Sequence, residues 1–130
     1  MQIQVMYSPN ATDKWSQAPD KKIRVSTGQT ELDWSIQVIP ASAGTIAFNT
    51  NPPGIQFTGT GNNAWPGSPP TANGSGDITA TINNTLPKGG NSVSFHYKVN
   101  ALFTPTGGTQ QAVTWDPDVQ EDPPPAVMIG

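Results

Sequence analysis

Apolar and polar residues alternate along most of this chain, which is the two-residue period of a β-strand with one buried face. The alternation is clearest over residues 31–38, where one face carries Leu32, Trp34, Ile36 and Val38. The same pattern, or a short apolar run, occurs at 2–7, 22–26, 46–48, 55–57, 77–83, 93–100 and 111–115. Turn-forming Gly, Pro and Asn residues separate these segments. We therefore predict seven or eight strands.

The spacing of these strands favours one architecture. Several short strands separated by turn signals are typical of an antiparallel sandwich rather than a barrel. Residues 1–115 form the predicted domain, and residues 116–130, which are acidic and rich in proline, form a tail. Trp15 lies in a polar connection, and the long connection 59–76 contains Trp65. Because the second connection exceeds the usual loop length, we expect it to be functional, mobile or both.

Composition favours strands over helices. The chain has three leucines against 32 β-branched residues, which prefer pleated strands, so a helical bundle is excluded. Glycine and proline make 27 of 130 residues, close to the level typical of disorder. The net charge of −3 argues against disorder, because unfolded chains of low hydropathy usually repel themselves strongly. We expect one folded domain with a core and no disulfide.

Charge and hydropathy limit the classes of partner. The isoelectric point near 4.7 argues against nucleic acid, whose binding requires clustered Lys and Arg. No apolar run is long enough to cross a bilayer, so we expect no membrane partner. The first residues have neither the charged nor the apolar region of a signal peptide, and the cytoplasm is the default location. The absence of cysteine leaves the compartment open.

The chain offers few groups for catalysis. His96 is the only histidine, and its position in the strand pattern directs it away from the core. Ser94 lies on the same face, but residues two apart on a strand are about 6.5 Å apart, too far for a nucleophile and its base. One histidine without cysteine does not suit zinc. We therefore expect a non-enzymatic protein without a cofactor or a metal.

Carboxylates cluster in the tail, where Asp116, Asp118, Glu121 and Asp122 fall within seven residues. Their oxygens suit calcium, although the segment lacks the glycine and the ligand spacing of a helix–loop–helix calcium site. The alternative is a solvated acidic tail or a cover for a sheet edge. Basic residues concentrate between Lys14 and Arg24, and this charge asymmetry suits either self-association or pairing within the chain.

Two tryptophans are candidates for ligand contact. Trp34 and Trp115 fit buried strand faces, whereas Trp15 and Trp65 lie in polar connections. Exposed aromatic residues on loops stack on sugar rings or anchor protein partners, and the alternative is that each one plugs its own loop. The candidate contact residues are Trp15, Trp65, His96, Asp116 and Asp118. We expect a protein-interaction or self-associating module, with a carbohydrate-binding module, assisted by calcium, as the alternative.

Several core positions resemble those of immunoglobulin-like domains. Trp34 lies inward on the third main strand, where such domains place a core tryptophan. The usual disulfide is missing, and the resemblance places Val25 and either Tyr97 or Val99 at its two ends. Phe95 falls at the tyrosine-corner position and lacks the hydroxyl group that makes the corner hydrogen bond. This resemblance implies an immunoglobulin-like sandwich held by packing alone.

A second resemblance is confined to the tail. Trp115-Asp116-Pro117, followed by Asp122-Pro123, is similar to the motif of a small bacterial family of uncharacterised proteins named for DP and EP dipeptides. Here the second dipeptide is DP rather than EP, and the match covers about a dozen residues. The resemblance implies an immunoglobulin-like fold and no known activity.

Overall fold

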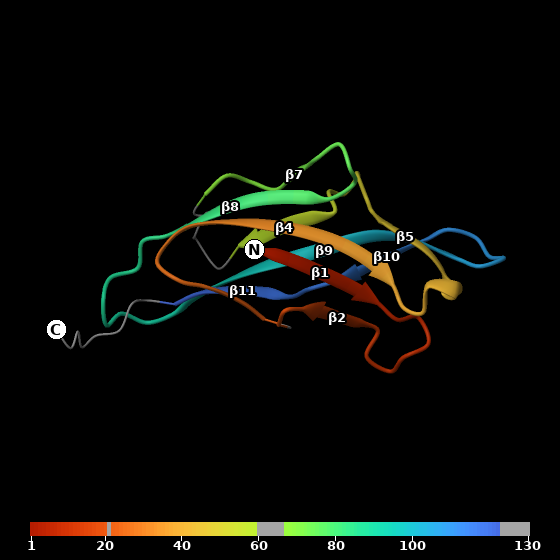
Figure 1. The fold of residues 1–130 in the computed structure, drawn as a ribbon, viewed down its shortest axis with the longest axis horizontal. Coiled ribbons are helices and arrows are strands. Elements are labelled where there is room, and N and C mark those ends of the chain that lie inside the picture. Colours follow the sequence, from red (N-terminus) through yellow and green to blue (C-terminus); the bar gives the residue numbers. More distant parts are fainter. Residues whose placement is uncertain (21, 60–66, 123–130) are drawn as a thin grey trace.

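The computed structural model describes residues 1–20, 22–59 and 67–122 and is all-β, as predicted (Figure 1). The elements are β1 (Gln2–Tyr7), β2 (Trp15–Ala18), β3 (Ile23–Val25), β4 (Gly28–Val38), η1 (Ala41–Ala43), β5 (Gly44–Phe48), β6 (Ile55–Gly59), β7 (Thr71–Ala72), β8 (Ile78–Asn84), β9 (Val93–Pro105), β10 (Gln111–Trp115) and β11 (Asp118–Glu121). The strands beyond the predicted eight are β2, β7 and β11, which lie in segments assigned to connections and to the tail. Within the described ranges, no helix is long and apolar enough to span a membrane.

The strands form two sheets. The first has the order β2-β1-β4-β8-β7. In the second, the long strand β9 is central, with β5 and β6 on one side and β10 and β11 on the other, and β3 follows β11 at the edge. Pairing is antiparallel except for β1 with β4 and β3 with β11, which run parallel. The expectation of antiparallel pairing throughout does not hold for these two pairs.

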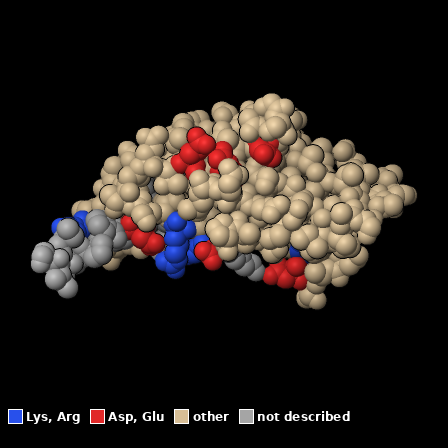
Figure 2. Space-filling model, viewed as in Figure 1, with Lys and Arg blue, Asp and Glu red and all other residues tan. Residues whose placement is uncertain are grey.

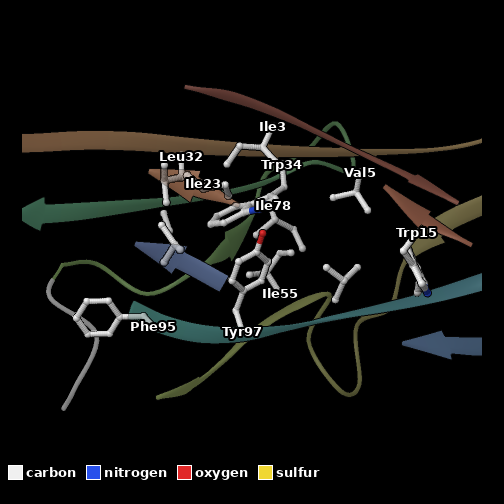
Figure 3. Close-up of a cluster of buried hydrophobic side chains, with 14 of the residues drawn as sticks. Ile3, Val5, Trp15, Ile23, Leu32, Trp34, Ile55, Ile78, Phe95 and Tyr97 are labelled. Atoms are coloured by element: carbon white, nitrogen blue, oxygen red, sulfur yellow. The ribbon is translucent and has the colours of Figure 1, made fainter. Parts of the chain in front are cut away.

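Side chains of both sheets share one core between the layers (Figure 3). Trp34 of β4 and Tyr97 of β9 are fully buried and meet edge to face, with ring centroids 5.7 Å apart. Val25 and Val99 are buried in the same cluster. The Tyr97 hydroxyl donates a 2.8 Å hydrogen bond to Oε1 of Gln17, a buried polar contact that joins β9 to β2. Packing therefore fills the region where the sequence lacks a cross-link.

Residues 118–121, beyond the predicted boundary, continue the second sheet. The Tyr97 amide donates to the Pro117 carbonyl at 3.1 Å, and β11 then pairs with both β9 and β3. Val119 is fully buried in the core. Nδ2 of the buried Asn84 donates to the carbonyls of Val25 at 3.0 Å and Asp122 at 2.8 Å. The predicted boundary at residue 115 thus falls inside the folded unit, which includes at least residues 118–121.

Candidate interaction surface

Trp15 belongs to the core rather than to a ligand-contact surface. It begins β2, is 8% exposed and lies 4.7 Å from Tyr7 between ring centroids. Its indole stacks on that of Trp115, with centroids 5.8 Å apart and planes inclined by 1°. The prediction that Trp15 contacts a ligand from a polar loop is therefore corrected, because the alternation of β2 turns its ring inward.

The other candidate residues that the structure describes do not form a site with Trp15, which is buried. Trp65 lies outside the described residues. His96 is exposed, as its strand position predicts, and its backbone pairs in register with that of Asp118. Asp116 is exposed on the connection between β10 and β11. These three positions lie on and beside β9 and β11.

The described residues also bring no metal site together. No group of three or more His, Asp and Glu side chains in this part of the chain is placed to hold a metal ion. Asp122 is instead engaged within the protein: its Oδ1 accepts a 2.9 Å hydrogen bond from Ser92 and lies 3.6 Å from Nη1 of Arg24. This ion pair supports pairing within the chain for at least one of the clustered basic residues. Both partners are partly solvated, so the pair contributes little to stability.

The described segments at one end of the molecule contain no charged residue. The sequence has no Lys, Arg, Asp or Glu between Asp33 and Asp77, or between Lys98 and Asp116. The fold brings parts of these two runs together, and Figure 2 shows the end with β5 and the β9–β10 turn without acidic or basic groups on the visible face. We call β5, the 49–54 loop and the 106–110 turn the uncharged end.

The six-residue loop 49–54 leaves the edge of β9 and is held there by hydrogen bonds to Asn100. Strands β5 and β6 pair with consecutive parts of β9, and only residue 100 lies opposite the loop. The Asn49 amide donates to the Asn100 carbonyl, and the Asn100 amide donates to the Gly54 carbonyl, both at 2.9 Å. Nδ2 of Asn100, which is 2% exposed, donates to the Pro53 carbonyl at 2.8 Å. The backbone of Asn100 thus fixes both ends of the loop, and its side-chain amide adds a contact at Pro53.

The β9–β10 turn is tied to the start of β5. The Thr106 amide donates to the Ala43 carbonyl at 2.9 Å, and its Oγ1 donates to the Ser42 carbonyl at 2.7 Å. Gly44 follows with φ of +153°, and a Cβ at this position would collide with the Thr104 carbonyl oxygen. Side chains other than glycine are excluded where β5 begins, because the two backbones approach too closely. Hydrogen bonds and close backbone packing therefore hold the uncharged end in a defined conformation.

Strand β5 leaves the core incompletely covered. Its inward residues Ile46 and Phe48 are half-buried, whereas their partners in register on β9, Phe103 and Ala101, are 2% and 0% exposed. Within the described residues β5 pairs with β9 on one side only. No described strand pairs with its other side, although β4 of the other sheet approaches β5 closely, and Ile46 and Phe48 remain partly accessible to solvent.

A small hollow of about 240 Å³ lies between the 49–54 loop and strands β7 and β8. It is lined mainly by apolar groups, including Pro53, Ile55 and Ile78. Gly54 forms part of its wall, where a Cβ would lie 2.5 Å from Cβ of Phe48. The volume is below the usual range for small-molecule sites. A larger hollow of about 420 Å³, on the outer face of β1 and β4 beside Pro19, is shallow and open.

The features of the uncharged end were missed by the sequence analysis, although one signal was available. The long run without charge between Asp33 and Asp77 spans β5, β6 and β7. The role of Asn100 had no such signal, because an asparagine in an alternating strand reads as an outward polar residue. No protein-family model matches this chain, and comparison with curated proteins finds no match either.

Proposed function

We propose that this chain is a non-enzymatic, immunoglobulin-like module that binds protein through its uncharged end. The observation that carries the proposal is the open edge of β5 at an end without charge. Exposed strand edges are usually blunted by charged residues, proline or a covering element, because they pair readily with other strands. Strand β5 contains neither charge nor proline, and its outer edge is unpaired among the described residues. Strand addition is a common mode of protein recognition.

The order of the strands supports the immunoglobulin-like part of the proposal. In such domains one sheet has the strand order A-B-E-D and the other has C-F-G. If β4 corresponds to strand B, the first sheet places β1, β4, β8 and β7 in this order. The second sheet places β9 between β5 with β6 and β10 with β11, as F lies between C and G. Two departures are the parallel pairing of β1 with β4 and the position of Trp34, which lies on the B-like strand.

The distribution of reactive side chains supports a binding role over catalysis. His96 is exposed on a regular strand, and the described carboxylates do not form a cluster of three. Trp15 is stacked inside the core, which removes one of the two tryptophans on which carbohydrate binding depended. A protein partner is accordingly favoured over a sugar.

Site-specific photo-crosslinking tests this proposal. A benzophenone amino acid replaces Ala47, which is exposed on β5, or Gln29, which is exposed on the outer face of β4. After irradiation at equal concentrations in purified protein and in an extract of the source cells, we expect discrete protein adducts from position 47 and none from position 29. Absence of adducts from position 47, or equal adducts from both, would contradict the proposed function.

A further inference from the structure

We propose that the partner of the β5 edge is β5 of a second copy of this chain, paired antiparallel about a twofold axis at Ile46. This inference rests on the proposed function, because it names the partner of the uncharged end. The pairing would join the β9-containing sheets of two copies into one continuous sheet. Four features of β5 support the inference. Some of its amide and carbonyl groups point to the open edge, and these groups are self-complementary in an antiparallel pair. The strand has no charged residue, and its inward side chains are half-buried.

The hydrogen bonds to β9 determine which backbone groups of β5 are free. Residues 43 and 49 bond to β9, since the Ala43 carbonyl accepts from Thr106 and the Asn49 amide donates to Asn100. In an antiparallel pair, bonded and non-bonded residues alternate. Thr45 and Ala47 therefore direct their amide and carbonyl groups to β9. The amide and carbonyl groups of residues 44, 46 and 48 are directed to the open edge.

These three residues are self-complementary in an antiparallel pair. Centring the pair on Ile46 places it opposite Ile46 of the second copy and places Gly44 opposite Phe48. Each of the three positions then meets a residue whose amide and carbonyl also point to the edge. Each such pair exchanges two hydrogen bonds, which gives about six across the interface.

Charge favours a second copy at this edge over the edges with charged residues. Two identical chains of net charge −3 repel each other, and a neutral contact keeps their charges apart. Strand β3 contains Arg24, which would lie opposite Arg24 of a second copy across that edge. Strand β10 is also an uncharged edge, but one of its inward side chains, Trp115, is stacked on Trp15 of the other sheet.

Pairing would also complete the core. Ile46 and Phe48 are half-buried beside fully buried residues of β9. A second β5 strand alongside them would cover the edges of these side chains and remove apolar area from water, which favours association. The exposed outward side chains, Thr45 and Ala47, would face each other across the pair at about 5 Å between Cβ atoms.

Two charge variants of the full chain test the inference by sedimentation velocity and light scattering over a wide concentration range. In T45K/A47K, each introduced ammonium group lies opposite one on the other copy. In T45K/A47E, the opposing groups have opposite charge, and the net charge of the chain is unchanged. Both positions are solvent-exposed, and circular dichroism and thermal melting check that both variants fold. T114K, on exposed β10, is the control for adding charge to another edge strand.

We expect the natural chain to form a dimer of twice 13.7 kDa. T45K/A47K should raise the dissociation constant at least about 100-fold, whereas T45K/A47E and T114K should stay within about tenfold of the natural value. A natural chain that is monomeric up to about 0.5 mM, or a folded T45K/A47K that still dimerises, overturns the inference. A monomer whose position 47 crosslinks to a different protein overturns the inference alone. A monomer without such adducts overturns the proposed function as well.

Discussion

The indole rings of Trp15 and Trp115 lie parallel, inclined by 1°, with centroids 5.8 Å apart. The stack joins β2 of one sheet to β10 of the other and closes the core on that side. We expect Trp15→Ala to lower the free energy of unfolding by about 3–5 kcal/mol, as truncation of a buried aromatic ring usually does. A double-mutant cycle with Trp115→Ala in urea should give a coupling of about 1 kcal/mol. A loss below about 0.5 kcal/mol for Trp15→Ala would place this residue outside the core.

The side-chain amide of Asn100 donates a hydrogen bond that an aspartate at this position could not donate. In Asn100→Asp, Nδ2 is replaced by an oxygen that cannot donate to the Pro53 carbonyl and is buried at the same position. We expect a loss of about 2–3 kcal/mol in urea denaturation, together with faster hydrogen exchange in the 49–54 loop. Asn83→Asp, at an exposed position on β8, is the matched control and should change stability by less than about 0.5 kcal/mol. Equal effects of the two substitutions would contradict the anchoring role.

Val119, in the segment predicted to be an acidic tail, is buried in the core. Val119→Ala removes two methyl groups from a fully buried position between β9 and β3 and should cost about 2 kcal/mol. Thermal unfolding should remain a single transition at lower temperature, because β11 belongs to the same cooperative unit. Thr114→Ala, at an exposed position on β10, is the comparison and should cost clearly less. An unchanged melting temperature for Val119→Ala would restore the domain boundary at residue 115.

A panel of glycans and calcium separates protein binding from the carbohydrate alternative. A ligand that binds only the folded state adds about 2.7 kcal/mol of stability at a hundred times its dissociation constant, and that addition raises the melting temperature by several degrees. We expect no shift with any member of the panel, since Trp15 is inside the core. A reproducible shift with a glycan that is lost on Trp65→Ala would instead favour carbohydrate binding.

Much of the fold could be predicted because it follows from the two-residue period. The alternation in β4 and β9 places Trp34 and Tyr97 in the core, and both are fully buried. The segment with Trp15 was missed because β2 is four residues long, too short for alternation to stand out from a polar loop. Strand β11 was missed because its segment is rich in proline and acidic residues, although its Val119 is buried in the core.

The candidate surface was harder to predict, because it depends on contacts between distant residues. Asn100 is polar within an apolar strand, and only the excursion of the chain between β5 and β6 provides its acceptor at Pro53. Whether a strand is central or at an edge depends on the order of strands in the sheet, which alternation does not encode. The sequence shows that β5 has no charged residue, but this indicates a pairing surface only because β5 lies at a sheet edge.

The most direct test of strand pairing at β5 is amide hydrogen exchange measured by NMR at low and high protein concentration. Thr45 and Ala47 donate to β9 within one chain, so their amides should be protected at every concentration. The amides of Ile46 and Phe48 point to the open edge, and their exchange should slow at least about tenfold as the concentration rises. Strand pairing at β5 therefore requires protection to alternate along these four consecutive residues. Rapid exchange of Ile46 and Phe48 at every concentration would contradict it.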